Sequence, residues 1–324
     1  MFPWGDLKKP FFVLAPMDGA TDLVFRQVVA HCGRPDVFVT EFTSVEGLVS
    51  KGAEKVGERL RFHESEHPII AQIWGTDVEA FYEASKKVAA MGFDGIDINM
   101  GCPVRAVVGH GACSALIKNH ALAKQIIAAV KKGAGKLPVS VKTRIGFGEI
   151  AIDTWIPFLL EQGLDALAVH LRTVKEMSLV PAHWELAAEI VALRDKIAPE
   201  TVLIGNGDVS SIVDGEKKAK QSGMEGIMIG RGVFHNPYVF NKAVDFAGMP
   251  KEEKIALLRY HLDIFEKSGG DPIRQFAPLK RFFKIYIQGF DGASELRQKL
   301  METKSLEQVH TLLSLIAAVK AKIR

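Results

Sequence analysis

Eight short runs of apolar and β-branched residues recur along the first 240 residues of the chain, each followed by a stretch with helical periodicity. They span residues 11–16, 37–42, 69–74, 95–100, 139–144, 166–171, 202–207 and 226–230. The runs are apolar nearly throughout rather than alternating, which is typical of parallel strands covered on both faces. Eight strand–helix units of this length predict a TIM (β/α)8 barrel. An open doubly wound sheet is disfavoured, because the first turn reads APMDGATD and contains no GxGxxG.

The C-terminal part of the chain has a different organisation. After Ala247–Pro250 the strand signals stop, and the remaining segments have helical periodicity. We therefore predict two domains, a barrel at residues 1–247 and a small α-helical bundle at 248–324. The bundle has 14 Lys and Arg against 9 Asp and Glu, a net charge of +5, whereas the rest of the chain carries −2. This bias suggests a polyanionic partner, with a solvated helical surface as the alternative.

Composition excludes several other classes of protein. No run of eighteen apolar residues occurs, so we expect no membrane-spanning segment. The N-terminus lacks the basic start, apolar middle and cleavage site of a signal peptide. The three cysteines, Cys32, Cys102 and Cys113, are odd in number and form no CxxC pair. We therefore expect no disulfide framework, no metal site and a cytoplasmic location.

Polar and small residues gather where the predicted strands end. The positions are Pro16 and Met17 after the first strand, Gln72 in the third, Asn99 and Cys102 at the fourth, Lys142 and Arg144 in the fifth, His170 and Arg172 at the sixth, Asn206, Gly207 and Asp208 at the seventh, and Gly230 and Arg231 at the eighth. The active site of a TIM barrel lies at this end of the strands. The pattern therefore predicts one site built from seven of the eight strand ends.

The last two of these loops are suited to a phosphate group. The segments Gly205–Ser211 and Gly230–Pro237 place small residues where backbone N–H groups can approach an anion. They follow the seventh and eighth strands, where barrels commonly hold a ligand phosphate. Two ordinary glycine turns are the alternative interpretation, and the occurrence of both in this position favours phosphate.

Lys142 ends an apolar strand and needs an acceptor, because an unpaired buried charge is unfavourable. A flavin ring offers such acceptors. A Schiff-base lysine is the rival interpretation, but it leaves Cys102 and His170 without a function.

Cys102 stands between Gly101 and Pro103 in a tight turn after the fourth strand. A thiol at the mouth of a barrel can donate a proton, or attack as a thiolate where a nearby cation lowers its pKa. An inert buried thiol is an equally good interpretation of the local sequence. We interpret Cys32 and Cys113, each in a helical segment, as packing thiols.

The chain resembles the tRNA-dihydrouridine synthases over nearly its whole length. The segments LAPMDGATD, NMGCP, VSVKTRIG, HLRT with AHW, GNGDV and GIMIGRGVFHNP occur in the family's order and with similar spacing. The C-terminal helices resemble the family's RNA-binding bundle. The resemblance implies an FMN enzyme that reduces the 5,6 double bond of a uridine in structured RNA, with tRNA as the first choice and NADPH as electron donor.

The resemblance also implies a role for each strand-end residue. Cys102 would be the general acid that protonates carbon 5 of the uracil. The flavin ring and ribityl chain would be held by Pro16, Met17, Gln72, Lys142 and His170, and the phosphate end by Asn206, Gly207, Asp208, Gly230 and Arg231. Asn99, Arg144 and Arg172 would meet the RNA in the pocket. In the basic tail we predict phosphate contacts by Lys280, Arg281 and Lys284. We expect a monomer that binds no DNA.

The sequence departs from the commoner family pattern at positions expected to face RNA. Ala106 replaces a lysine, Leu171 a glycine and Ser178 a tyrosine. The expected flavin and acid residues are intact, so these changes leave the target open between tRNA and rRNA.

Two other classes of protein share part of this pattern. A small-molecule FMN oxidoreductase of the dihydroorotate dehydrogenase type would not need the basic tail, and a non-catalytic RNA-binding protein would not need Cys102 and Lys142.

Overall fold

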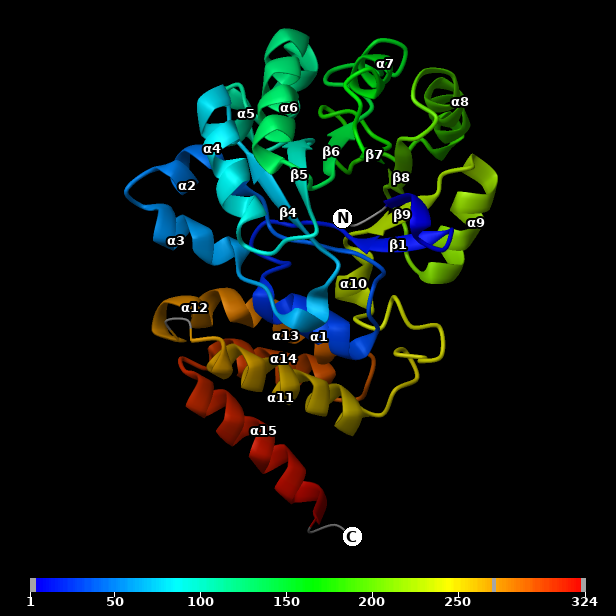
Figure 1. The fold of residues 1–324 in the computed structure, drawn as a ribbon. Helices are drawn as coiled ribbons and strands as arrows, with labels where there is room; N and C mark the ends of the chain where they lie inside the picture. Colours follow the sequence, from blue (N-terminus) through cyan, green and yellow to red (C-terminus); the bar gives the residue numbers. More distant parts are fainter. Residues whose placement is uncertain (1–3, 270–271, 322–324) are drawn as a thin grey trace.

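The computed structural model describes residues 4–269 and 272–321 and contains a parallel β-barrel (Figure 1). Its strands are β1 (Phe11–Leu14), β2 (Phe38–Val39), β3 (Thr43–Ser44), β4 (Ile69–Trp74), β5 (Gly95–Met100), β6 (Val139–Arg144), β7 (Ala166–His170), β8 (Val202–Asn206) and β9 (Gly226–Ile229). The hydrogen-bonded order is β1-β9-β8-β7-β6-β5-β4-β2. A parallel bridge between Val13 and Val37 brings β1 beside β2 and closes the circle. The predicted TIM barrel is confirmed.

The predicted second strand, 37–42, is not continuous. The structure has β2 and β3 in its place, and both pair with β4. Between β2 and β3, hydrogen bonds to side chains replace part of the backbone ladder. The Gln72 N–H donates to the Thr40 hydroxyl at 3.0 Å, and the Glu41 carboxylate accepts from the backbone N–H of Gly19. The first strand also ends earlier than predicted, at Leu14, since Pro16 has no N–H to donate.

Helices surround the strands on the outside (Figure 1). They are α1 (Leu23–Cys32), α2 (Val45–Val49), α3 (Ala53–Gly57), α4 (Val78–Ala89), α5 (Arg105–Gly109), α6 (His120–Ala134), α7 (Trp155–Leu160), α8 (Ala187–Ile197), α9 (Ile212–Ser222) and α10 (Gly232–His235). Side-chain caps fix where several of them begin. Asp22, Asp77 and Asn119 each accept a backbone N–H from the first turn of α1, α4 and α6, respectively.

Apolar side chains are buried on both faces of the strands, which explains the continuous apolar runs. One cluster fills the inside of the barrel and includes Phe11, Val13, Ile70, Ala168, Ile204 and Met228. A larger cluster lies between the strands and the helices and includes Leu14, Ile73, Ile98, Val141 and Leu203. Alternating strand positions therefore serve two apolar layers, as parallel sheets require.

The C-terminal helices lie together on one side of the barrel, next to α1 and α10 (Figure 1). They are α11 (Lys251–Lys267), α12 (Pro272–Leu279), α13 (Phe283–Tyr286), α14 (Ala293–Glu302) and α15 (Leu306–Ala321), which confirms the predicted bundle. Phe25 of α1 stacks on Phe282 with ring centroids 5.0 Å apart, and His261 of α11 lies 6.1 Å from the ring of Phe25. The division at residue 247 stays a prediction, because these contacts join both parts in one apolar core.

No helix in the described part of the chain is long and apolar enough to cross a membrane. Within the same residues, no group of three or more His, Cys, Asp or Glu is placed to hold a metal ion.

Candidate active site

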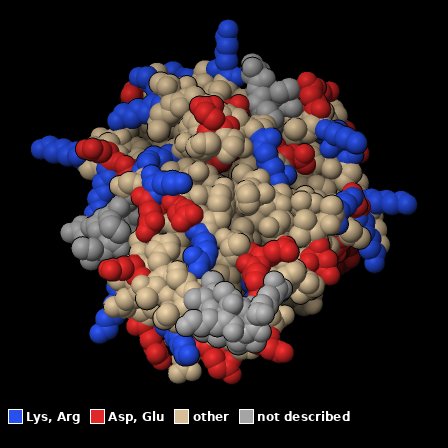
Figure 2. Space-filling model, turned by 90° about the horizontal axis from the view of Figure 1, so that it is seen from below, with Lys and Arg blue, Asp and Glu red and all other residues tan. Residues whose placement is uncertain are grey.

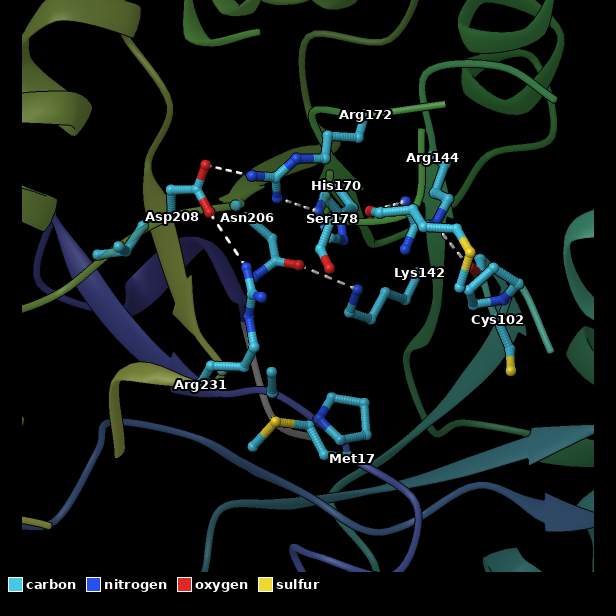
Figure 3. Close-up of a pocket in the computed structure, with 18 of the residues that line it drawn as sticks. Met17, Cys102, Lys142, Arg144, His170, Arg172, Ser178, Asn206, Asp208 and Arg231 are labelled. Atoms are coloured by element: carbon cyan, nitrogen blue, oxygen red, sulfur yellow. Dashed lines mark hydrogen bonds and ion pairs between the residues drawn. The ribbon is translucent and has the colours of Figure 1, made fainter. Parts of the chain in front are cut away.

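A cavity of about 800 Å³ opens at the C-terminal ends of the strands (Figure 3). Strand β6 and the loops after β1, β5, β7, β8 and β9 all contribute to its lining. It brings together thirteen of the predicted residues: Pro16, Met17, Asn99, Cys102, Lys142, Arg144, His170, Arg172, Asn206, Gly207, Asp208, Gly230 and Arg231. Gln72, Lys280, Arg281 and Lys284 are not part of the lining. In Figure 3, Asp208 and Arg231 lie at one side, Cys102 at the other, and Lys142 between them.

Two arginines converge on Asp208 at one side of the cavity. The Asp208 carboxylate accepts hydrogen bonds from Arg172 and, at 3.3 Å, from Nη2 of Arg231. The Arg172 hydrogen bond is the main cause that lowers the pKa of Asp208 below its usual value. The adjacent Gly207 has φ +128°, and a Cβ there would come within 2.7 Å of the Ala182 Cβ. Two guanidinium groups and a loop that excludes side chains therefore meet at this point, which fits a phosphate group.

Lys142 lies in the middle of the cavity with little to bind. Its Nζ donates to Asn206 Oδ1 at 3.3 Å, and Asn206 is itself fixed because its Nδ2 donates to the Met228 carbonyl at 2.8 Å. Desolvation, with the nearby Arg144 charge, lowers the pKa of Lys142 to about 8. One long hydrogen bond leaves the ammonium group able to bind further acceptors, as a flavin ring would provide.

His170 is held as a neutral imidazole. Desolvation and the neighbouring cations, Lys142 first, put the pKa of His170 far below its usual value. Its Nε2 lies 3.1 Å from Nη1 of Arg172, so the neutral ring accepts this hydrogen bond and carries its proton on Nδ1. His170 therefore offers the cavity an uncharged donor.

Arg144 and Arg172 are buried, with 6% and 2% of their surfaces exposed. Arg144 donates to the carbonyls of Gly101 at 2.9 Å and of Thr173 at 3.0 Å. Arg172 donates to the Val180 carbonyl at 2.6 Å. These arginines thus tie together the loops after β5 and β7, and their predicted contact with RNA stays a prediction.

Cys102 is half-buried in the turn after β5, with its backbone firmly held. Its N–H donates to Asn99 Oδ1 at 2.9 Å, and its carbonyl accepts from the Ser114 hydroxyl at 2.7 Å. A hydrogen bond from the Cys113 thiol is the main cause that lowers the pKa of Cys102 to about 7, against the opposing effect of burial. A thiol of this pKa can both donate a proton and remain as a thiolate near neutral pH.

Sequence reasoning missed the role of Cys113. It is fully buried at the start of the 3-10 helix Cys113–Lys118, as expected of a packing thiol, but it also contacts the Cys102 thiol. The same contact raises the pKa of Cys113 above its usual range. Two cysteines at either end of one short loop were the available signal. Cys32 is buried on α1, consistent with the predicted packing role.

Replacing Cys113 by alanine is expected to raise the pKa of Cys102 from about 7 toward its usual value near 9. The Cys102 thiolate loses the hydrogen bond that the Cys113 thiol donates to it, whereas the neutral Cys102 thiol loses little stabilisation. The rate of Cys102 alkylation by iodoacetamide follows the thiolate, so its pH profile should move to higher pH. Peptide mapping identifies the alkylated cysteine, and Cys32→Ala is the matched control. A profile that coincides with that of the parent would show that the thiol contact has no influence.

Gln72 and Asp97 lie beneath the cavity rather than in its wall. Gln72 is fully buried, and its Nε2 donates to Asp97 Oδ2 at 2.7 Å. Burial raises the pKa of Asp97 to about 6. Sequence reasoning treated 95–100 as an apolar run and missed this inward-facing carboxyl group. The carboxylate between two apolar neighbours was the signal.

The three predicted RNA contacts of the tail differ in their surroundings. Lys280 donates to the Met301 carbonyl at 2.7 Å, and Arg281 donates to the carbonyl of Gly19 in the loop after β1. Lys284 is exposed. Figure 2 shows blue and red side chains intermixed on the face seen from below, so the positive charge of the tail forms no continuous patch there among the described residues.

Comparison with known proteins decides the family. The family model described as dihydrouridine synthase matches residues 13–323. The chain belongs to the dihydrouridine synthase family. It is 50% identical to a probable tRNA-dihydrouridine synthase of Staphylococcus aureus (strain N315) over 316 residues, 96% of this chain and 94% of the relative. The same identity holds for probable tRNA-dihydrouridine synthase 2 of Bacillus subtilis (strain 168), with 96% and 95% covered.

Solved structures support the fold alone. A 2-naphthoyl-CoA reductase complex superposes with a TM-score of 0.57 at 11% identity, covering 73% of this chain and 51% of that one. A histamine dehydrogenase from Rhizobium sp. 4-9 gives 0.52 at 12% identity, with 78% and 48% covered. Membership of the family confirms the predicted enzyme class, a flavin-dependent oxidoreductase that synthesises dihydrouridine.

Proposed function

We propose that this dihydrouridine synthase reduces a uridine of tRNA, with FMN as cofactor, NADPH as electron donor and Cys102 as general acid. The observation that carries the proposal is the arrangement of one cavity. A thiol whose pKa is lowered to about 7 lies at one side, and two arginines converge on Asp208 beside a glycine loop at the other. A tRNA substrate also implies that the enzyme works in the cytoplasm.

The residues of the cavity fit FMN. Arg231 and the loop at Gly207 would hold the phosphate group, and Lys142 with His170 would hold the ring. The absence of a GxGxxG segment from the sequence favours a mononucleotide over a dinucleotide. When bound, the flavin supplies the hydride that reduces carbon 6 of the uracil. The Asp208 carboxylate would stay on the buried Arg172, while the exposed Arg231, whose hydrogen bond to Asp208 is long at 3.3 Å, would turn to the phosphate.

Cys102 would donate the proton that carbon 5 of the uracil receives. A general acid works best when its pKa is close to the working pH, and that of Cys102 is about 7. The Cys113 thiol stabilises the thiolate that remains after the transfer. Asn99, whose carbonyl oxygen holds the Cys102 N–H, stands beside the reacting position and would contact the base.

The substrate uridine must leave its stack to reach this cavity, because the cavity lies at the ends of buried strands. Arg144 and Arg172 would meet the flipped base or its phosphate. We favour tRNA over rRNA because both curated relatives carry tRNA-dihydrouridine synthase in their names.

Two observations test this function. The purified protein should be yellow and should release FMN rather than FAD on denaturation. Dihydrouridine mapped across total RNA should disappear from a tRNA position when the gene is deleted, and should return with the intact gene. A colourless protein that takes up no added FMN would overturn the cofactor assignment, and loss of dihydrouridine from rRNA alone would overturn the choice of tRNA.

Reversing the charge of Lys280 and Lys284 together is expected to weaken tRNA binding and flatten its salt dependence. Each lost phosphate contact removes roughly one unit from the slope of log affinity against log salt. Arg281 is left intact because it binds the Gly19 carbonyl next to the cavity-lining Asp18, whereas Lys280 binds the Met301 carbonyl of α14, which does not line the cavity. Reversal of Lys124 and Lys196, exposed on α6 and α8, is the control with equal charge change. An equal slope in both double variants would place the RNA footprint elsewhere.

A further inference from the structure

A file of hydrogen-bonded side chains leads from inside the barrel to the backbone of Cys102. Gln72, Asp97 and Ser140 are register partners on β4, β5 and β6. Gln72 Nε2 donates to Asp97 Oδ2 at 2.7 Å, and Asn99 Nδ2 donates to Gln72 Oε1 at 2.9 Å. Asn99 Oδ1 then accepts the N–H groups of Gly101 at 3.1 Å and of Cys102 at 2.9 Å.

Every hydrogen bond of this file runs in the same direction. A primary amide has a donor end and an acceptor end of nearly equal shape, so it fits its site in two orientations. An ionised carboxylate only accepts. Asp97 therefore requires the NH2 end of Gln72 to face it, and Gln72 in turn requires the NH2 end of Asn99. The oxygen of Asn99 is thereby left for the Cys102 N–H, so the carboxylate at one end and the backbone N–H groups at the other favour the same orientation.

We propose that Asp97 is a positioning residue for Cys102, which acts by fixing the orientation of the Gln72 and Asn99 amides. The inference rests on the proposed function, since it assigns Cys102 the proton transfer. Asp97 is not among the residues that line the cavity, so we infer that it acts through Gln72 and Asn99 rather than by direct contact. Gln72, which the sequence suggests as a flavin ligand, transmits the orientation.

A purely structural role would not need a carboxylate here. Asparagine has the same shape and could still bond to Gln72 and Ser140, without the unfavourable burial of a charge. That unfavourable burial is visible in the pKa of Asp97, which is raised to about 6. The carboxylate differs from the amide in one useful respect, because it has no donor and permits one orientation only. Ser140 donates to Asp97 Oδ1 at 2.6 Å but lies outside the path to Cys102.

The decisive variant is Asp97→Asn, studied in the flavin-loaded protein at pH 8. With an amide at position 97, the turned orientations of Gln72 and Asn99 are no longer excluded from this end, and only the N–H groups of Gly101 and Cys102 still favour the parent orientation. Molecules that turn place the Asn99 NH2 against the Cys102 N–H. We expect the amide hydrogens of Gly101 and Cys102 to exchange with solvent ~10-fold faster or more, since they lose their acceptor. Oxidation of the reduced enzyme by uridine RNA should slow by ~10- to 100-fold, as expected for a misplaced catalytic group.

The double variant Asp97→Asn with Gln72→Glu tests whether the direction of these hydrogen bonds decides the effect. It moves the acceptor-only group one step along the file, so that the new carboxylate at position 72 accepts from the amide at position 97 and from Asn99. Exchange at Cys102 should then return to within about threefold of the parent and the rate should largely recover. Ser140→Ala is the matched control, because it removes a hydrogen bond to Asp97 but leaves its charge. Both readouts should stay near those of the parent.

The outcomes separate this inference from the proposed function. Parent-like exchange at Cys102 in Asp97→Asn, or a double variant as impaired as the single one, would overturn the positioning role. A parent enzyme that uridine RNA does not oxidise would overturn the proposed function, and the exchange data would still decide whether Asp97 orders the turn.

Discussion

Cys102→Ala is expected to bind FMN, accept electrons from NADPH and bind tRNA about as well as the parent, yet to be oxidised by tRNA ~100- to 10,000-fold more slowly. This is the range that a lost general acid normally produces. The fold should tolerate the change, because the contacts of Cys102 with Asn99 and Ser114 are made by its backbone. The defect should therefore fall on the proton transfer alone.

Two further cysteine variants sharpen this result. Cys102→Ser should keep a trace of activity, since a hydroxyl can donate a proton but is a weaker acid. Cys32→Ala removes a buried thiol of α1 away from the cavity and should leave the rate unchanged. If Cys102→Ala keeps a rate within about threefold of the parent, in the same anaerobic assay, Cys102 is a packing residue and the mechanism is wrong.

Lys142→Met is expected to weaken FMN binding by ~10- to 100-fold, because hydrogen bonds to charged groups contribute about 1.5–3 kcal/mol each. Methionine keeps the length of the side chain and removes its charge. Flavin dissociation, followed by fluorescence, measures the effect. The matched control is Lys87→Met, an exposed lysine of α4 whose Nζ donates to the Leu48 carbonyl at 2.8 Å. Equal flavin loss in both variants would contradict a specific contact.

Without flavin, Lys142→Met should be more stable than the parent at neutral pH, although it binds flavin more weakly. Burial lowers the pKa of Lys142 to about 8 from 10.5, so between these values the unfolded chain holds a proton that the folded chain has lost. The free energy of unfolding of the parent therefore rises as pH increases from 8 to 10.5. Below pH 8 the buried charge lowers this free energy by ~3 kcal/mol at most, compared with its value above pH 10.5. Lys142→Met should raise the thermal midpoint at pH 7, with a smaller gain at pH 10. A lower midpoint at pH 7 would contradict the buried charge.

The strands and the site residues could largely be predicted from the sequence, because both depend on local pattern. Continuous apolar runs identified the barrel, and polar residues at the strand ends identified thirteen residues that line one cavity. The second strand could not be predicted as it is. Its ladder is interrupted by hydrogen bonds to Thr40 and Glu41, whose partners lie far away in the chain.

The missed features of the site depend on long-range contacts. The Cys102 pKa is set by Cys113, which approaches only because the intervening loop folds back on itself. Gln72 is predicted to hold the flavin from its position at a strand end, and this stays a prediction. Its hydrogen bond to Asp97 could not be predicted, because strand register rather than sequence pattern decides which side chains meet there.

A single turnover without oxygen tests whether the enzyme passes electrons from NADPH through its flavin to tRNA. Enzyme loaded with FMN is reduced with one equivalent of NADPH and mixed with unmodified tRNA, while flavin absorbance and dihydrouridine are both followed. We expect the flavin absorbance to return and one dihydrouridine to form for each flavin oxidised. Flavin that stays reduced with tRNA, or returns without any dihydrouridine, would contradict it.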